Sequence, residues 1–418
     1  MRISNSSGHV LGGAFLIAGT TIGVGMLALP IVTAPGGFLP SVALYLICWL
    51  FMLCTGLLTL EICIWMPKDA NFITMSRILL GRGGQFIVWI LYLFLFITIM
   101  IAHVAGGGDI LVQIFGDWLP RWVAKIVYVG AFIPLVYFGT RTVDRFNIIL
   151  MTGLILSYLL FVFVAAPHLE FKLLERSDWS KVWYALPVLF TAFSFQVIIP
   201  TVMNYMGRNV KKVRLALFIG TLIPLVVYLV WQFLILGIIP HEGPGSLQEA
   251  AQQGNNAVMP LKTVTQNPYL FGIGKAFAFF TLTASYIALS LAFLDFLADG
   301  LKLTKTATHK FWLCLIVFVP PTVIALTYPH IFLSALGYAG GFSCAILFGL
   351  LPPIMTWVGR HVHHYHDDTR QLFGGKYFLT VLILFIVFEL IIEITDQFSG
   401  SQVGFYLRNF AQFTLTLS

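Results

Sequence analysis

Polar and helix-weakening residues stand inside two of the most apolar stretches of the sequence. The first stretch, LIAGTTIGVGMLALP, covers residues 16–30 and sets two threonines among the glycines Gly19, Gly23 and Gly25. The second, LPVLFTAFSFQVIIPTVMNYMG, covers residues 186–207 and encloses Ser194 and Gln196 between two prolines. Glycine weakens a helix by about 1 kcal/mol relative to alanine, and proline removes a backbone hydrogen bond. Both stretches therefore predict interrupted helices, whose free N–H and C=O groups can bind a charged small molecule without covalent chemistry.

Close helix packing is an alternative explanation for the glycines of the first stretch. Gly19 and Gly23 form a GxxxG pair, a spacing that lets two membrane helices approach each other. The prolines of the second stretch favour interrupted helices, because they break the sixth apolar run of the chain as the glycines break the first. Two breaks five runs apart predict an inverted five-helix repeat, in which the broken helices cross at the bilayer midplane. Helix N-termini attract a carboxylate and free carbonyls attract an ammonium group, so a zwitterionic amino acid fits this polarity.

The composition places these stretches in a membrane. The chain has 418 residues, of which 59% are hydrophobic and 10% charged, and its mean hydropathy is +0.91. Because soluble domains carry roughly 25% charged residues, we predict a polytopic membrane protein in contact with lipid. The net charge of +7 does not indicate nucleic-acid binding, since Lys and Arg occur in short clusters between apolar runs. The five cysteines have no paired spacing, so neither a disulfide framework nor a zinc site is expected.

About eleven apolar runs are long enough to cross a bilayer, which takes about 20 residues in a helix. They lie at residues 8–34, 38–65, 85–115, 122–139, 146–166, 182–206, 214–239, 271–298, 310–328, 331–357 and 377–395. We therefore expect an all-α fold with a single transmembrane domain over residues 1–418. Residues 8–166 and 182–357 would form the two five-helix repeats, and residues 377–395 an additional helix. Residues 240–270 would form an external loop with a short helix or lid.

The distribution of basic residues predicts the orientation. With a cytoplasmic N-terminus, 16 of the 24 Lys and Arg residues fall on the inside. This bias favours a cytoplasmic N-terminus and, with an odd number of spans, an external C-terminus. The first run is longer than the core of a signal peptide and lacks a small-residue cleavage site, so it is expected to persist as a span.

Five segments of the sequence carry a family resemblance. They are IAGTTIGVGMLALP, GLLTLE ending at Glu61, RTVDRFN at residues 141–147, LFTAFSFQVIIPTVMNYMG, and LAFLDFLADGLK around Asp295. In this order they resemble the hydroxy and aromatic amino acid permeases, the bacterial tyrosine- and tryptophan-specific permeases of the amino acid, polyamine and organocation superfamily. The resemblance covers nearly the whole chain. It implies a LeuT-like fold in the bacterial cytoplasmic (inner) membrane, and uptake of an aromatic amino acid, tyrosine first and tryptophan second, by proton symport with alternating access.

The resemblance also implies a set of substrate-binding residues. The carboxylate and amine of the substrate would be met by two threonines and by the backbone of three glycines: Thr20, Thr21, Gly19, Gly23 and Gly25. The side chain of the substrate would be approached by residues of the sixth run: Phe193, Ser194, Phe195 and Gln196. The third and eighth helices would complete the pocket with His103 and Ser285. His103 and Gln196 depart from the family pattern, which has tyrosine and often histidine at these positions, so the pH dependence or the selectivity can differ.

Three ionisable residues are candidates for proton coupling, because such residues are costly inside a bilayer: Glu61, His103 and Asp295. Two of them also have a structural interpretation. Glu61 could form an interfacial ion pair with Lys68 or Arg77. His103 could simply bind a neighbouring carbonyl group.

Two further carboxylates lie one turn apart on the last run. Glu389 and Glu393 are expected to face a partner protomer, a lipid headgroup or a basic loop rather than the transport path.

Sodium is the alternative coupling ion. On this fold a sodium site would use carbonyls of the first helix and hydroxyls of the eighth, where four are available: Thr281, Thr283, Ser285 and Ser290. The same hydroxyls could instead bond back to their own helix.

Other classes of function fit the sequence less well. The absence of a G-x-x-x-x-G-K-[ST] loop indicates that energy comes from a gradient, and no H-E-x-x-H motif or nucleophile with a base indicates an enzyme. A channel would need a continuous polar path, which most runs do not offer. The segment RHVHHYHDD at residues 360–368 is expected to be a solvated loop rather than a zinc site, so neither metal nor cofactor is predicted.

Overall fold

The chain folds into a bundle of long helices. The computed structural model describes residues 9–68, 70–116, 118–303, 306–365 and 369–399. In these residues there is no strand, and the pairing of Gly37 with Ser177 is an isolated bridge. Ten helices are long and apolar enough to cross a membrane, and a helix pair bent by 59° makes an eleventh span. The predicted all-α fold with about eleven spans is therefore confirmed.

The first half of the bundle contains five spans. They are α1 (Val10–Thr21) with α2 (Gly25–Thr33), α3 (Phe38–Trp65), α4 (Phe72–Phe115), α5 (Arg121–Phe138) and α6 (Thr140–Ala165). The largest difference from the predicted bounds is at α4, which was expected to start at residue 85. Gly81, at φ 75°, joins a short helix to the start of this span. The side chain of Asn71 accepts a hydrogen bond from the Thr74 N–H and caps the combined helix.

The second half contains six spans, which follow the predicted order. They are η3 (Val182–Ala185) and α7 (Leu186–Ala192) with η4 (Gln196–Ile198) and α8 (Ile199–Tyr205), α9 (Val210–Ile238), α12 (Pro268–Gly300), α13 (Ala307–Thr327), α14 (Phe332–Tyr338) with η5 (Ala339–Leu350) and α15 (Leu351–His361), and α16 (Gly375–Ser399). The segment η5 is a π-helix.

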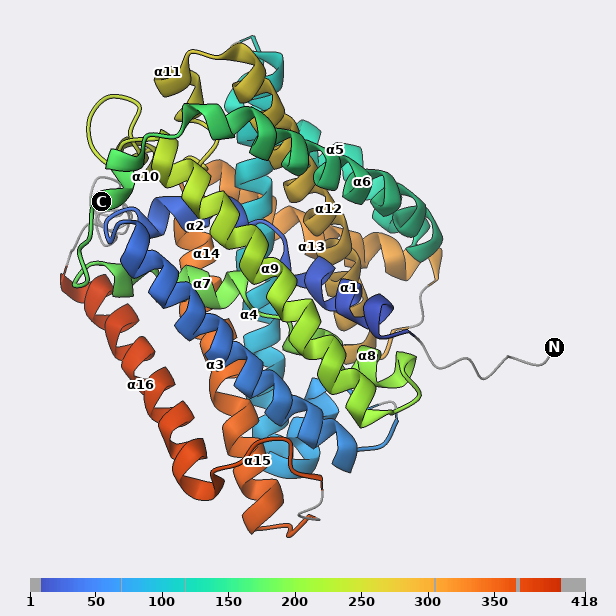
Figure 1. Cartoon of the computed structure of the whole chain (residues 1–418). Helices are drawn as coiled ribbons and strands as arrows, with labels where there is room; N and C mark the ends of the chain where they lie inside the picture. The colour runs from blue at the N-terminus through green and yellow to red at the C-terminus, as the bar shows by residue number, and fades with distance from the viewer. Residues whose placement is uncertain (1–8, 69, 117, 304–305, 366–368, 400–418) are drawn as a thin grey trace.

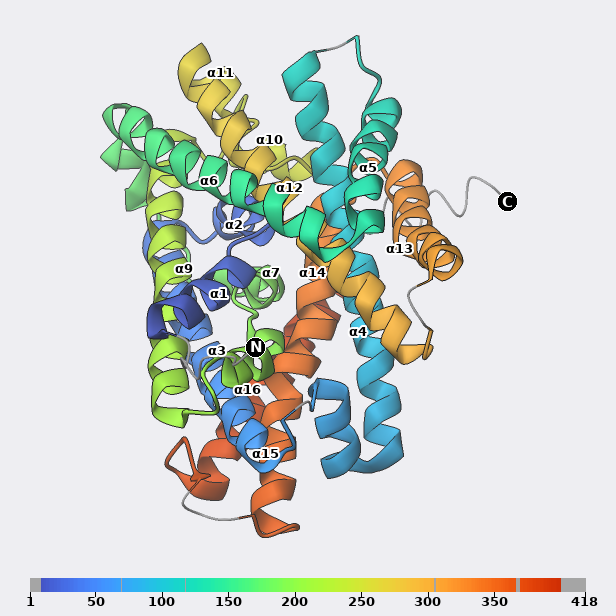
Figure 2. The same cartoon turned by 90° about the vertical axis from the view of Figure 1, so that its right-hand side faces the viewer.

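The breaks in the two interrupted spans lie in the middle of the bundle, between helices from both halves. Figures 1 and 2 show α2 and α7 among longer helices, while α1 reaches the middle of the bundle from its outer side. The helix α9 packs against α1 and α3, whereas α4 packs against α12, α13 and α14. The breaks therefore lie where these two groups of helices meet.

Residues 240–270 form two short helices at one end of the bundle, here called the loop end (Figure 1). These are α10 (Leu247–Gln252) and α11 (Leu261–Thr265). The Ala257 N–H donates to the Leu27 carbonyl at 3.0 Å, so this segment is fastened to α2. The segment thus covers the loop-end side of the first broken helix.

A buried ion pair joins α3 to α15 at the opposite end, here called the Glu61 end. Arg360 Nε and Nη2 donate to the two carboxylate oxygens of Glu61, each at 2.7 Å. The Gln371 N–H donates to Glu61 Oε2 at 2.8 Å, which brings the chain after α15 over the pair. Glu61 is 0% exposed. The partner of Glu61 is Arg360 rather than Lys68 or Arg77, because the fold places the end of α15 beside the end of α3.

Removing one member of this pair should cost more than removing both. In Arg360→Met the Glu61 carboxylate stays buried without its counter-charge, so the free energy of unfolding should fall by about 3–5 kcal/mol. The double variant Glu61→Gln with Arg360→Met buries no charge and should recover most of this loss. Equilibrium unfolding in mixed micelles measures both, and a double variant as unstable as Arg360→Met would contradict the interpretation.

Candidate binding site at the helix breaks

Both predicted interruptions are present. In the first broken span α1 ends at Thr21 and α2 begins at Gly25, with an extended residue, Ile22, after α1. In the second, α7 ends at Ala192 and η4 begins at Gln196. Gly23 lies inside the first break, so Gly19 and Gly23 do not form one GxxxG face. The interrupted-helix interpretation of the glycines is confirmed.

The two breaks touch each other through Gly25. A Cβ atom on Gly25 would lie 3.0 Å from the Cβ atom of Ala192 and 3.1 Å from its Cα atom. Such contacts are tighter than van der Waals packing allows without movement of the neighbour, so any larger residue at 25 would push the start of α2 away from the end of α7. The glycine therefore permits the close approach of the two half-helices.

Tyr228, on α9, binds the free carbonyl groups at both breaks. Its hydroxyl oxygen lies 2.7 Å from the Thr21 carbonyl oxygen and 3.0 Å from the Ala192 carbonyl oxygen. The hydroxyl has one hydrogen, so these two carbonyls compete for a single donor. Both carbonyls belong to the C-terminal ends of helices, which carry partial negative charge. The breaks thus offer a buried point of negative potential, which suits a positively charged group.

The sequence gives little sign of this tyrosine. Its only mark is a hydroxyl in the middle of the seventh apolar run, PLVVYLVWQF, at a depth where a polar atom needs a partner within the protein.

His103 and Ser285 meet beside the first break. His103 Nε2 lies 2.8 Å from the Ser285 hydroxyl oxygen, and Nδ1 lies 2.8 Å from the Ile99 carbonyl oxygen. A Cβ atom on Gly23 would lie 3.4 Å from the Cβ atom of Ser285. The structure therefore brings the third and eighth helices together beside the first break.

The threonine hydroxyls of the first break bond within their own helix. Thr20 Oγ1 and Thr21 Oγ1 each donate to the Ile17 carbonyl at 2.8 Å. Thr21 is buried, whereas Thr20 is exposed. The break consequently presents mainly backbone groups, including those of Gly23.

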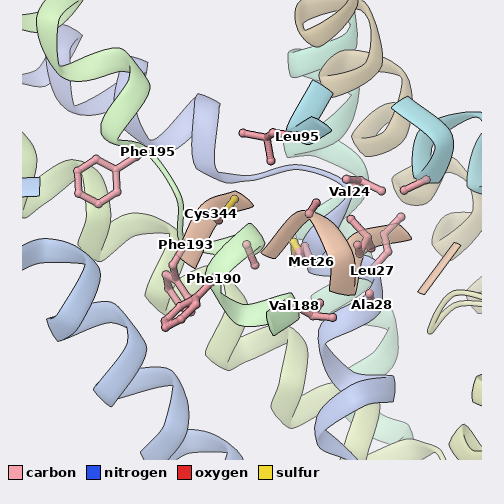
Figure 3. Close-up of a cluster of buried hydrophobic side chains, with 14 of the residues drawn as sticks. Val24, Met26, Leu27, Ala28, Leu95, Val188, Phe190, Phe193, Phe195 and Cys344 are labelled. Atoms are coloured by element: carbon pink, nitrogen blue, oxygen red, sulfur yellow. The ribbon is translucent and has the colours of Figure 1, made fainter. Parts of the chain in front are cut away.

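The side chains at the second break are oriented in two directions. The Phe193 ring packs edge-on against Tyr228, with ring centroids 5.2 Å apart. Gln196 faces α3 instead, where its Nε2 donates to Thr55 Oγ1 at 2.9 Å, and its Oε1 accepts from the Phe195 N–H at 2.9 Å. Figure 3 shows Phe195 well apart from the α2 side chains, whereas Phe193 lies beside Phe190.

Ser194 binds within its own half-helix, because its hydroxyl donates to the Thr191 carbonyl at 2.9 Å. Of the four residues predicted from the sixth run, Phe193 thus packs against Tyr228. Phe195 and Gln196 fasten the second break to α3 instead.

Only one of the three predicted coupling residues lies at the breaks. Glu61 is bound to Arg360 at the Glu61 end. Asp295 is half-buried on α12, ten residues after Ser285 and therefore about 15 Å further along the helix. His103 is the coupling candidate that the fold places beside the half-helices.

Three of the four hydroxyls considered for a sodium site bond to carbonyls of their own helix. Thr281 donates to Phe277 at 2.8 Å, Ser285 to Thr281 at 2.7 Å and Ser290 to Tyr286 at 2.7 Å. In the described part of the chain, no group of three or more His, Cys, Asp or Glu residues is arranged to hold a metal ion.

Comparison with known proteins gives consistent relatives along the whole chain. The tryptophan/tyrosine permease family matches residues 6–393. The chain is 29% identical to the tryptophan-specific transport protein of Pseudomonas aeruginosa (strain UCBPP-PA14), over 90% of this chain and 92% of that protein. It is 30% identical to the tyrosine-specific transport system 2 of Haemophilus influenzae, over 92% of this chain and 96% of that protein. It is 26% identical to glutamine transporter 2 of Aliivibrio fischeri, over 92% of this chain and 99% of that protein.

A solved structure shows the same fold. The manganese transporter of Eremococcus coleocola, crystallised with an aromatic bis-isothiourea compound, superposes with a TM-score of 0.58. It is 15% identical, and the match covers 98% of this chain and 94% of that one. This likeness concerns the fold alone and confirms the predicted LeuT-like architecture.

Tyr228→Phe should destabilise the protein, because it leaves the Thr21 and Ala192 carbonyls without this donor. We expect a loss of about 1–3 kcal/mol in the free energy of unfolding. Tyr92→Phe is the matched control, since the Tyr92 hydroxyl is buried without a hydrogen-bond partner among the described residues and its removal should be neutral or stabilising. Equilibrium unfolding in mixed micelles compares the two, and equal effects would count against the role given to Tyr228.

Proposed function

The chain belongs to the tryptophan/tyrosine permease family, and on this basis we propose that it imports an aromatic amino acid, tyrosine first and tryptophan second, by proton symport. The relatives are named as transport proteins, so the chain is a transporter and not an enzyme. The observation that carries the proposal is the meeting of two half-helix ends at Tyr228. The name of the glutamine transporter makes glutamine a substrate to be tested beside the aromatic ones.

The polarity of the breaks supports an amino acid as substrate. The Thr21 and Ala192 carbonyls would accept hydrogen bonds from the substrate ammonium group, which has three donors against the single one of Tyr228. The N–H groups at the start of α2 would hold the carboxylate, because a helix N-terminus carries free donors and partial positive charge. Phe193 would lie near the substrate side chain.

His103 supports coupling to protons, since its surroundings suit both protonation states. With a neutral ring, Nδ1–H donates to the Ile99 carbonyl and Nε2 accepts from the Ser285 hydroxyl. With a charged ring, Nε2–H donates to Ser285, whose hydroxyl hydrogen then turns to the Thr281 carbonyl at 2.7 Å. A proton can therefore bind to His103 Nε2 and leave it while every hydrogen-bonding group of the ring keeps a partner.

The transport cycle would be alternating access in the bacterial inner membrane, with the N-terminus in the cytoplasm and the C-terminus outside. The repeats of residues 8–166 and 182–357 would rock against each other around the breaks. The loop end would then face outward, and the contact of Ala257 with Leu27 would help to close that side. Sodium coupling stays the alternative, with the buried Thr283 hydroxyl on α12 as a candidate ligand.

Uptake into liposomes tests the proposal directly. The purified protein would be given radiolabelled tyrosine, tryptophan, phenylalanine or glutamine, with serine as the control, under an inward proton or sodium gradient. We expect an aromatic substrate to accumulate with the proton gradient and to be lost when an ionophore collapses it. Accumulation with sodium alone would overturn proton coupling, and accumulation of none of the aromatic substrates would overturn the assigned substrate class.

Ser285→Ala tests the role of His103 in proton binding. The substitution removes the hydroxyl oxygen that accepts a hydrogen bond from Nε2–H of the charged His103 ring. A hydrogen bond to a charged group contributes about 1.5–3 kcal/mol. The proton concentration for half-maximal uptake should therefore rise about tenfold or more.

Ser290→Ala is the matched control, because Ser290 lies on the same helix and, like Ser285, donates to the carbonyl four residues earlier, that of Tyr286. Its uptake should keep the pH profile of the unmodified protein. Identical profiles for Ser285→Ala and the unmodified protein would remove the His103–Ser285 pair from the proposed mechanism.

A further inference from the structure

Two carboxyl groups on the last helix face the interior of the protein. Glu389 is 0% exposed and Glu393 is 9% exposed. The expectation that they face a partner protomer, a lipid headgroup or a basic loop is wrong for Glu389, which is buried inside the protein, where α16 packs against η5 and α15. A Cβ atom on Gly341 of η5 would lie 2.8 Å from Glu393 Cδ, which places the second carboxyl directly against the π-helix.

Glu389 has no hydrogen-bond partner for either carboxyl oxygen within the described residues. The titratable groups that interact with it electrostatically are two thiols and a second carboxyl: Cys48 on α3, Cys344 on η5 and Glu393. None of these groups can supply a positive charge.

Among the described residues, the other elements packed against α16 give Glu389 no free counter-charge. The helix α7 (LPVLFTA) contains no titratable residue, and η3 contributes the exposed Tyr184. The helix α15 carries His361 and Arg360 at the Glu61 end, where Arg360 is bound to Glu61. An ionised carboxylate in such surroundings costs far more than a neutral one, so this site favours a bound proton.

The π-helix connects the two carboxyl groups to the second broken span. A Cβ atom on Gly340 would overlap the Pro187 carbonyl of α7, while the next residue, Gly341, faces Glu393. The Thr191 hydroxyl of α7 also donates to the Leu336 carbonyl at 3.0 Å, just before η5 begins. The segment η5 is therefore held between α7, which ends at the break, and the carboxyl face of α16.

A π-helix of this length is an unusual element. The segment covers 12 residues, whereas most π-helices are single turns, often found at functional sites. Gly340 brings the η5 backbone against the Pro187 carbonyl of α7, and Gly341 brings it against the Glu393 side chain of α16, so a displacement of α7 would press η5 against this carboxyl group. Movement of α7 at the break would thus reach Glu393, one turn from Glu389, through η5.

We propose that Glu389 is a second proton-binding site, which holds a proton while α16 packs against η5 and releases the proton when α7 moves during transport. Binding forms one O–H bond on a carboxyl oxygen and removes one negative charge, and release reverses both. This inference rests on the proposed function, because it assigns a site to the co-transported proton. It places that site on the additional helix, away from His103 at the breaks.

The test uses Glu389→Gln, which is permanently neutral and nearly isosteric with the protonated acid. Glu175→Gln is the control, because it removes one carboxylate from an exposed position outside the spans. If Glu389→Gln does not fold, Glu389→Met supplies an apolar side chain of similar volume for the same measurements.

The first measurement does not depend on transport. Infrared difference spectra of the purified protein in lipid, taken between acidic and alkaline pH, should show the carbonyl band of a protonated carboxyl group. We expect the unmodified protein and Glu175→Gln to share a band that Glu389→Gln lacks. Identical bands in all three proteins would overturn the proposal, whether or not the protein transports any amino acid.

The second measurement compares exchange with accumulation in liposomes. Glu389→Gln should keep substrate exchange at equal pH, while accumulation driven by a proton gradient should fall at least about tenfold, equivalent to about 1.4 kcal/mol of coupling. Loss of the infrared band with unchanged accumulation would overturn the proposal, because the proton on Glu389 would then not be a transported one. An unmodified protein without any uptake would contradict the proposed function, while the infrared result would still decide whether Glu389 binds a proton.

Discussion

Backbone groups released by a broken helix must find partners inside the protein, because the hydrocarbon region of a bilayer offers none. This constraint shapes the centre of the molecule. The half-helices α1 and α7 end beside each other, and one hydroxyl, that of Tyr228, lies within hydrogen-bond distance of a carbonyl from each. The same carbonyls are the groups that an ammonium substrate would use. The same two carbonyl oxygens thus hold the breaks together through Tyr228 and stay available to a ligand.

Buried polar contacts around the breaks extend this arrangement to neighbouring helices. Gln232 on α9 accepts from the Tyr45 hydroxyl of α3 and donates to Thr33 Oγ1 of α2, both at 2.7 Å. Gln196 fastens the second break to α3 through Thr55. Each of these side chains uses a donor or acceptor that would be costly to bury alone. Together they hold the short helices α2 and η4, which are too short to be stable without tertiary contacts.

Buried glutamates occupy two chemically opposite environments. Glu61 accepts two hydrogen bonds from Arg360 and one from the Gln371 backbone, so its charge is compensated where α3 and α15 end. Glu389 has thiols and another carboxyl around it and no hydrogen-bond partner in the described structure. The first environment suits a fixed structural contact and the second suits exchange of a proton, because only the second gains by neutralising the carboxylate.

The sequence by itself determined the features that depend on local composition. Runs of about 20 apolar residues predicted the spans, and glycine and proline within two of them predicted the breaks, since both properties act within a few residues. The tertiary structure alone decided which distant residues meet: Arg360 with Glu61, Ser285 with His103, and Tyr228 with both breaks. It also decided that Glu389 faces inward. In helices that are apolar on every side, the hydrophobic pattern does not mark the face that packs, so only the neighbouring helices fix the direction of each polar side chain.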